Sequence, residues 1–445
     1  MTTVAILIPG IMGSVLKLGD EVIWPGPVSS LILPFAKMAE LMREDLVAVD
    51  CIRTFSFTDQ YQSMIDDLNA CGFSEAAQTL VIAAYDWRKD NALAAQKLAD
   101  HIDAARTRHG NTVKIILVAH SMGGLVARFY LESGQFNNRQ GFANVAQLIT
   151  LGTPHNGAAL ALAMVLGQQK RLFLSKDQVL QATSDPRYPA AYQLLPKRGE
   201  PFTWQGDVGD DLIDIYDPEI GARLGLVAAN MQAAERFRAG LDLSRRPAHV
   251  RYFAFSGTQQ STATHLVIRP RGGNRLEANP IETDDGGDGT VPIWSAFLPD
   301  LERLFVGGEH GTIYKDNGLR HVLRRLLGKR DTLAGIPDVV QLSIRDKVVE
   351  PEDIIHLSIS FGKSIRDFSG VLTIERAQTD ANDVPTGVYE PPQAVNPVQY
   401  KGLGMEAMSL TVTAPDMPGF YRITLRNEIS AAPSGVDEFI VQQTV

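Results

Sequence analysis

The fold is decided by the stretch Lys114-Ile-Ile-Leu-Val-Ala-His-Ser-Met-Gly-Gly-Leu-Val-Ala-Arg-Phe-Tyr130. Its apolar run from Ile115 to Ala119 predicts a strand buried on both faces. Apolar residues spaced three and four apart from Met122 onward predict a helix. A sharp turn between the two would expose the hydroxyl of Ser121, as a nucleophile elbow requires. The usual G-x-S-x-G pattern begins with Gly where this chain has Ala119, and a serine in such a stretch is otherwise an ordinary helix cap.

Other apolar runs predict more strands of the same sheet. They are Val4 to Ile8, Leu80 to Ala84, Gln147 to Leu151, Arg251 to Ser256 and Leu301 to Val306. Helical segments between many of these runs favour a mostly parallel sheet in an α/β fold. Residues 157–250 interrupt the alternation and are too long for a connection. We therefore expect an α/β-hydrolase-type domain over residues 1–330, with a cap inserted at about 157–250.

The composition limits the classes of partner. The chain has 445 residues, 44% of them hydrophobic and 21% charged, and a formal net charge of −9. The acidic balance argues against nucleic acid as a partner and weakens adhesion to an anionic membrane by charge alone. We expect no signal peptide before the apolar run at Val4, and no apolar run reaches the length of a membrane span. We expect a cytoplasmic protein, peripheral at membranes where a local patch binds lipid, with Cys51 and Cys71 as free thiols.

Two later loops supply an acid and a base for Ser121. Asp288 lies in the glycine-rich stretch 284–292, with Asp285 as its reserve, and His310 follows the last predicted strand. The chain order Ser, Asp, His is the order of α/β-hydrolases. His310 would take the serine proton, and Asp288 would hold its imidazole. The aspartates lack the ligand spacing of a calcium loop, so we expect no metal. His155, after a strand, is the rival base.

The loop after the first strand, Pro9-Gly-Ile-Met-Gly-Ser14, has two readings. It is either a simple turn or half of an oxyanion hole, in which small residues let main-chain N–H groups point into a site. In the second case Ile11, or Met12 beside it, supplies one donor and Met122 the other. Two such preorganised donors stabilise a developing oxyanion.

An apolar segment with three prolines, residues 24–38, is poorly suited to a long helix. It is either a buried loop or a mobile lid that contacts lipid. Asp86 and Arg88, at the carboxyl end of another strand, are expected to pair and brace their loop. From these segments and the loop after the fourth strand, we expect substrate contacts from Met12, Trp24, Leu33, Trp87 and His155.

Taken together, the motifs resemble the lecithin:cholesterol acyltransferase-like family of α/β-hydrolases, which includes phospholipase A-type enzymes. The resemblance spans about residues 4–328 and is carried by Pro9-Gly-Ile-Met-Gly-Ser, Tyr85-Asp-Trp-Arg, Ala119-His-Ser-Met-Gly-Gly, Gly152-Thr-Pro-His-Asn-Gly, Gly287-Asp-Gly-Thr-Val-Pro and Glu309-His-Gly. It implies a serine lipase or acyltransferase without metal or organic cofactor. It also implies Ser121 as nucleophile, Asp288 as acid, His310 as base, and Ile11 and Met122 as oxyanion donors. Nothing in the sequence marks a sterol-acceptor pocket.

The composition changes after the segment 329–336, which is expected to be a linker. Short alternating runs separated by turns predict an antiparallel, immunoglobulin-like β-sandwich over residues 337–445. Such a domain could dock on the hydrolase, bind a protein partner or place the enzyme on its substrate.

The expected function is hydrolysis of lipid acyl esters, most of all phospholipids at a membrane surface. A carboxylesterase or thioesterase for soluble esters is the first alternative. A non-catalytic scaffold that binds a partner through the β-sandwich is the second, and the complete Ser121, Asp288 and His310 set argues against it. The head group, the acyl position, the acyl acceptor and the oligomeric state stay open.

Overall fold

The computed structural model describes residues 2–55, 58–197, 201–205, 212–299, 301–329, 340–428 and 434–443. Its centre is a six-stranded sheet in the order β14-β11-β9-β8-β1-β7, in which every neighbouring pair runs parallel. The strands are β1 (Thr3–Ile8), β7 (Leu80–Ile82), β8 (Lys114–His120), β9 (Val145–Leu151), β11 (Arg251–Thr258) and β14 (Glu302–Gly307). The mostly parallel sheet predicted from the apolar runs is confirmed.

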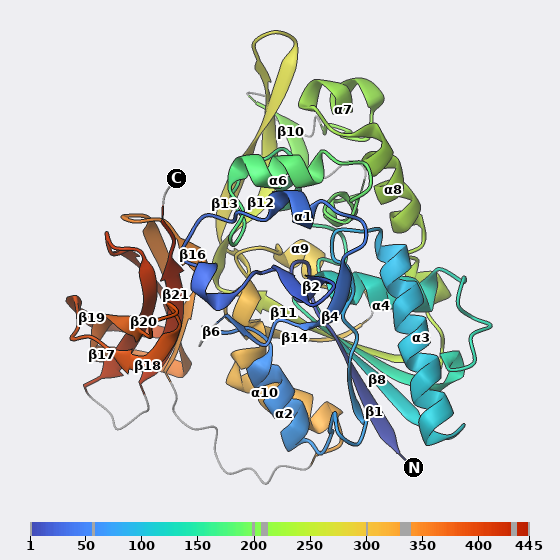
Figure 1. Cartoon of the computed structure of the whole chain (residues 1–445), viewed down its shortest axis with the longest axis horizontal. Helices are drawn as coiled ribbons and strands as arrows, with labels where there is room; N and C mark the ends of the chain where they lie inside the picture. The colour runs from blue at the N-terminus through green and yellow to red at the C-terminus, as the bar shows by residue number, and fades with distance from the viewer. Residues whose placement is uncertain are drawn as a thin grey trace.

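Both faces of this sheet are covered by helices, which explains the unbroken apolar runs of its strands. In β8, Leu117 packs into one apolar core and its neighbour Val118 into another, because successive side chains of a strand point to opposite faces. The helices of the first core are α3 (Asn91–His109), α4 (Met122–Glu132) and α8 (Ala228–Ala239). Those of the second are α2 (Gln62–Ala70) and α10 (Asn317–Leu326), seen in the lower part of Figure 1.

Short elements after β1 form a second layer near the carboxyl ends of the parallel strands. They are β2 (Ser14–Leu18), β3 (Glu21–Trp24), η1 (Val28–Ser30), α1 (Met38–Leu41), β4 (Val47–Cys51), β5 (Thr54–Phe55) and β6 (Thr58–Asp59). The first three of these strands form a small antiparallel sheet in the order β3-β2-β4. The indole of Trp24 at the end of β3 is fully buried. The segment that follows is therefore attached to the core at its first residue.

The region expected to be an inserted cap is helical, but it continues into a hairpin that the sequence did not predict. The cap elements are α5 (Leu160–Val165), α6 (Lys176–Thr183), η3 (Tyr192–Leu194), β10 (Phe202–Trp204), α7 (Pro218–Leu224), α8 and η4 (Leu243–Arg245). The hairpin strands β12 (Gln260–Arg271) and β13 (Arg275–Gly287) protrude at the top of Figure 1, and β10 pairs with β12. The remaining short helices are η2 (Phe142–Asn144), α9 (Ile293–Ala296) and η5 (His310–Lys315).

The C-terminal region forms a separate, curled β-sheet with its own apolar core, at the left in Figure 1. Its strands are β15 (Gln341–Ile344), β16 (Val348–Val349), β17 (Ile354–Thr379), β18 (Pro385–Tyr389), β19 (Ala394–Thr413), β20 (Gly419–Asn427) and β21 (Gly435–Val441). The long strand β17 pairs with β15 and β19 in its first half and with β19 and β20 in its second. The sheet is mixed, because β16 runs parallel to β21. The expected linker 329–336 lies outside the described residues except for Lys329.

The C-terminal sheet and the hydrolase region pack against each other. Val348, Phe420 and Ile440 of the sheet belong to the same apolar cluster as Trp24 and Leu31. Hydrogen bonds also join the chain after β21 to the proline-rich segment: the Gln443 N–H donates to the Ile32 carbonyl at 2.7 Å. None of the helices in the described ranges is long and apolar enough to span a bilayer.

Candidate active site

Three side chains from separate loops meet at the carboxyl ends of the parallel strands. His310 Nε2 lies 2.9 Å from Ser121 Oγ, and His310 Nδ1 lies 2.8 Å from Asp288 Oδ2. All three residues are buried. Since the carboxylate accepts a hydrogen bond from Nδ1–H, the neutral ring offers Nε2 as an acceptor for the serine hydroxyl. The structure thus brings the predicted nucleophile, base and acid into one hydrogen-bonded chain.

The turn at Ser121 is strained in the way that a nucleophile elbow requires. Ser121 has φ 51° and ψ −125°, between the end of β8 and the start of α4. The strand and helix approach each other so closely that a Cβ on Gly123 would lie 2.6 Å from the carbonyl oxygens of Ile8 and Pro9. Gly123 is therefore required here, whereas Ala119, at the position where the usual pattern has Gly, is accommodated with no exposed surface.

Main-chain N–H groups of its own loop hold the carboxylate of Asp288. Its Oδ1 accepts from the N–H of Thr290 at 3.0 Å and from the N–H of Val291 at 2.6 Å. The main-chain carbonyl of Asp288 accepts from the N–H of His310 at 2.8 Å, which joins the two loops directly. The reserve residue Asp285 lies exposed on β13 and takes no part. Among the described residues, no group of acidic, histidine or cysteine side chains is arranged to hold a metal ion.

A tight turn places main-chain N–H groups beside the serine. The Gly13 N–H donates to the Gly10 carbonyl at 3.1 Å, and Met12 has φ 60°, the positive value that the third residue of a type II turn requires. A Cβ on Gly10 would lie 2.9 Å from the Cβ of Ser121. Within the described chain, no hydrogen bond occupies the N–H of Ile11 or that of Met122, the first residue of α4.

Three aromatic side chains hold this turn in place, and sequence reasoning did not assign this role to any of them. The Gly10 N–H donates to Tyr61 Oη at 2.8 Å. Tyr85 Oη donates to the carbonyl of Pro9 at 2.9 Å, and Trp24 Nε1 donates to the carbonyl of Met12 at 2.9 Å. The sequence shows these three aromatic residues, but their spacing along the chain does not indicate which main-chain groups they contact.

His120 lines the same pocket, but its ring contacts neighbouring loops and not the hydroxyl of Ser121. Its Nε2 is 3.0 Å from the carbonyl oxygen of His310, and its Nδ1 is 2.8 Å from Tyr61 Oη. Because a carbonyl only accepts, Nε2 must carry the proton, and Tyr61 must donate to Nδ1. Burial, and then the nearby His310, lower the pKa of His120 to about 3. A neutral imidazole therefore links the turn around Gly10 to the loop of the base.

Glu309 is a buried carboxyl next to the base. Its Oε2 accepts from the Gly311 N–H at 3.0 Å. Burial, followed by the charge of Asp288, raises the pKa of Glu309 to about 8. Below this pKa the carboxyl of Glu309 is mostly neutral. It therefore adds no second negative charge beside Asp288.

The residues predicted to contact substrate lie in different parts of the structure. Met12 lines the pocket that contains Ser121 and His310. Trp24 is fully buried, packs edge-on against Trp87 and tilted against Phe35, and lies outside the lining of the Ser121 pocket. Leu33 is 46% exposed and lines a different cavity within its own segment.

His155, the rival base, serves as a brace. Its carbonyl oxygen accepts from Arg128 at 3.3 Å and from Arg238 at 3.1 Å, and its Nε2 lies 3.3 Å from Thr150 Oγ1. Burial, and then the two arginines, hold its pKa well below the usual value. It lies outside the lining of the Ser121 pocket.

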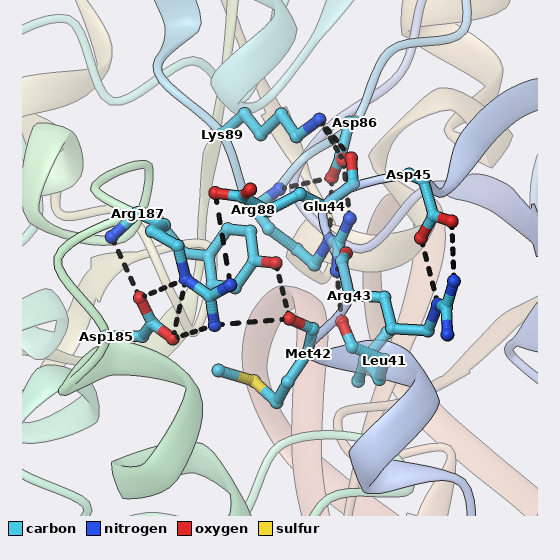
Figure 2. A network of polar contacts seen from close by, with 11 residues as sticks. Leu41, Met42, Arg43, Glu44, Asp45, Asp86, Arg88, Lys89, Asp185 and Arg187 are labelled. Atoms are coloured by element: carbon cyan, nitrogen blue, oxygen red, sulfur yellow. Dashed lines mark hydrogen bonds and ion pairs between the residues drawn. The ribbon is translucent and has the colours of Figure 1, made fainter.

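A polar network ties the hydrolase core to the cap (Figure 2). Asp86 and Arg88 pair as expected, at 2.8 and 2.6 Å, and both are buried. Arg88 Nη1 donates to the carbonyls of Leu41 and Arg43, while Tyr188 Oη of the cap donates to the Met42 carbonyl at 2.7 Å. The guanidinium of Arg88 also lies over the Tyr188 ring, 4.6 Å from its centre.

This network borders an apolar pocket of about 360 Å³, including the space at its open mouth, that touches the serine turn. Ile11 lines both this pocket and the one that contains Ser121. Trp87 lines the apolar pocket from the core side and Ala182 and Ala191 from the cap side. Of the predicted substrate contacts, Trp87 therefore lies next to the site, though not in the Ser121 pocket itself.

The parallel sheet, the strained serine turn and the Ser-His-Asp arrangement define an α/β-hydrolase. Residues 42–217 match the model of the lecithin:cholesterol acyltransferase family, and the resemblance seen in the motifs is thereby confirmed. No curated protein matches the chain by sequence.

Among solved structures, the crystal structure of the Tle4–Tli4 complex contains a chain that is 15% identical to this one. The match covers 75% of this chain and 100% of that chain, with a TM-score of 0.52, and it shows a shared fold. Phospholipase PlaB from Legionella pneumophila is 11% identical, over 99% of this chain and 92% of that chain, with a TM-score of 0.27. A metagenomic carboxyl esterase is 16% identical, over 69% and 64%, with a TM-score of 0.31. The last two likenesses are too low to support an argument.

Proposed function

We propose that the protein is a serine hydrolase that cleaves acyl esters of lipids, most of all phospholipids. The single observation behind the proposal is the chain of hydrogen bonds from Ser121 Oγ through His310 to Asp288, at 2.9 and 2.8 Å. The match to an acyltransferase family over residues 42–217 supports acyl transfer as the reaction type.

In the first half of the reaction, Ser121 Oγ attacks the ester carbonyl and His310 Nε2 takes the hydroxyl proton. Asp288 stabilises the imidazolium that forms. The negative charge on the carbonyl oxygen develops where the N–H groups of Ile11 and Met122 are available as donors, and such donors are worth several kcal/mol in other hydrolases. The leaving alcohol takes the proton from His310, which leaves the acyl group on Ser121.

In the second half, an acceptor enters the site of the departed alcohol, and His310 takes its proton. Water as the acceptor gives hydrolysis, and an alcohol gives acyl transfer. The apolar pocket beside Ile11 supports an acyl group of some length, since hydrocarbon gains free energy when it leaves water. Because hydrocarbon chains gain free energy when they leave water, we also propose that the substrate lies at a membrane surface.

A fluorophosphonate probe tests the nucleophile. It should label the wild type and Ser133→Ala, a change at the half-buried residue that follows α4, but not Ser121→Ala. The Ser121→Ala variant should lose at least about 10³-fold in kcat, with an unchanged melting temperature. Absence of labelling in folded wild type would count against any serine hydrolase.

The choice between lipid and soluble esters needs a second measurement. The ratio kcat/KM should rise from p-nitrophenyl acetate to p-nitrophenyl decanoate, and phosphatidylcholine in mixed micelles should release fatty acid. A preference for acetate, without release of fatty acid, would replace the lipase proposal by a soluble carboxylesterase.

A further inference from the structure

The pocket that contains Ser121 is completed by residues outside the hydrolase sheet. It holds about 890 Å³, including the space at its open mouth. Arg171 and Leu172 of the cap line one part of its wall, and residues 345–348 of the C-terminal sheet region line another. The loop between β15 and β16 is therefore part of the wall beside the reacting atoms.

Polar contacts fix this loop to the hydrolase region through Arg345 and to the C-terminal sheet through Lys347. The guanidinium of Arg345 donates to the carbonyl of Ser261 and lies 3.6 Å from a carboxylate oxygen of Glu282. Lys347 is buried and pairs with Asp437 of β21. Both cations of the loop are thus neutralised by neighbouring carboxylates.

The cap residue Arg171 is fixed by its neighbour in the chain. Lys170 Nζ lies 2.5 Å from Asp353 Oδ2 and 3.3 Å from Glu350 Oε1, both in the C-terminal region. Arg171 and Leu174 exchange two main-chain hydrogen bonds of 3.0 Å, which close a tight turn. The cap turn is therefore held against the C-terminal sheet, with Arg171 on the pocket side.

Two lining charges have no such neutralising partner. Within the described ranges, the half-buried Arg171 forms no side-chain ion pair, and neither does the exposed Asp346. The two residues also form no ion pair with each other. A pocket with one free cation and one free anion complements a ligand that carries both charges.

We infer that Arg171 and Asp346 recognise the head group of the lipid: Arg171 binds its phosphate, and Asp346 binds an ammonium group attached to it. The inference rests on the proposed lipid-ester hydrolysis and names the substrate class as zwitterionic phospholipid. A guanidinium presents paired N–H donors to phosphate oxygens, and a carboxylate accepts hydrogen bonds from an ammonium. The C-terminal region then determines specificity, because it supplies Asp346 and anchors the turn of Arg171.

The test compares three lipids with the same dioleoyl chains in micelles of a neutral detergent. Phosphatidylethanolamine has a phosphate and an ammonium, phosphatidylglycerol has a phosphate alone, and diacylglycerol has neither. The readouts are ratios of kcat/KM between lipids, which cancel any general loss of activity in a variant.

Arg171→Gln should lower the ratio of phosphatidylglycerol to diacylglycerol about tenfold, a modest value for a charge-assisted hydrogen bond. Arg171→Lys should restore much of that ratio. Asp346→Asn should lower the ratio of phosphatidylethanolamine to phosphatidylglycerol about tenfold, without lowering the first ratio. The exposed residues Arg236 and Asp20 supply the controls Arg236→Gln and Asp20→Asn, which should change neither ratio.

Unchanged ratios in Arg171→Gln or in Asp346→Asn would overturn the inference and leave the lipase proposal standing. A wild type that cleaves p-nitrophenyl butyrate but none of the three lipids would overturn the lipase proposal, and the inference with it. Melting temperatures within the error of the wild type show that a changed ratio does not come from misfolding.

Discussion

The ring of His120 joins the loop of His310 to the turn beside Ser121, because its Nε2 donates to the His310 carbonyl at 3.0 Å. Its Nδ1 accepts from Tyr61, whose oxygen accepts from the Gly10 N–H. One neutral imidazole therefore positions both the base and the neighbouring main-chain donors.

Acid should destabilise the fold through His120. Its pKa is lowered to about 3 in the folded protein, against about 6.5 in the unfolded chain. A depressed histidine pKa contributes stability above pH 6.5, and that stability is lost as the pH falls from 6.5 towards 3. Urea unfolding between pH 7.5 and 4.5 should show the wild type losing up to about 1.4 kcal/mol per pH unit more than His120→Gln. Parallel curves for the two proteins would show that His120 does not titrate this way.

Removing the hydroxyl of Tyr61 should weaken both the fold and the turnover. Tyr61→Phe leaves the Gly10 N–H and His120 Nδ1 without their partner, so the free energy of unfolding should fall by about 2–4 kcal/mol. Tyr314 stacks on Tyr61 and lines the same pocket, but its buried hydroxyl has no hydrogen bond. The matched change Tyr314→Phe should therefore leave the free energy of unfolding nearly unchanged. Equal losses in the two variants would show that the hydrogen bonds of the Tyr61 hydroxyl do not account for the effect.

A methyl group at Gly10 should displace the serine turn. The added Cβ would lie 2.9 Å from the Cβ of Ser121, so one of the two backbones must shift. A shift of this kind at reacting groups lowers kcat by about 100-fold. The matched change Gly272→Ala adds a methyl group in open space at the tip of the β12–β13 hairpin and should leave kcat at the wild-type value. Full activity in Gly10→Ala would show that the turn tolerates a shift.

The network around Arg88 should stabilise the fold mainly through the buried Arg88–Asp86 ion pair. Arg88→Met leaves the buried Asp86 with only the longer contact to Lys89 at 3.7 Å, and the free energy of unfolding should fall by about 3 kcal/mol. Arg187→Met breaks an ion pair whose arginine side chain is 46% exposed, so thermal unfolding should change little. Differential scanning calorimetry measures both, and a large shift for Arg187→Met would show that the cap depends on its exposed contacts.

The parallel sheet was predictable because its strands are unbroken apolar runs, as in residues 4–8 and 115–119. The β12–β13 hairpin was not, since its strands carry Pro270 and Pro280, and the exposed part of β13 has mixed polar residues. The C-terminal strands were visible as alternating runs. Their curled, mixed pairing was not, because β17 changes neighbours along its length in a way that no local pattern encodes.

At the site, the chain order of Ser121, Asp288 and His310 was enough to bring the three together, because loops at the carboxyl ends of parallel strands share one edge of the sheet. Trp24 and His155 were expected to touch substrate, but Trp24 holds the carbonyl of Met12 and His155 braces two arginines. Each role depends on a hydrogen-bond partner that the spacing of residues along the chain does not indicate. The contribution of residues 345–348 depends on how two regions pack, which composition does not reveal.

The pocket wall at residues 345–348 belongs to the C-terminal sheet region, whereas Ser121, Asp288 and His310 all lie in the hydrolase region. Selection can therefore alter this wall while the nucleophile, the base and the acid stay as they are. A lineage that exchanged or remodelled the C-terminal region would acquire a new substrate range without losing its chemistry. For the same reason, grafting this region between related hydrolases offers a way to change selectivity while leaving the reacting groups untouched.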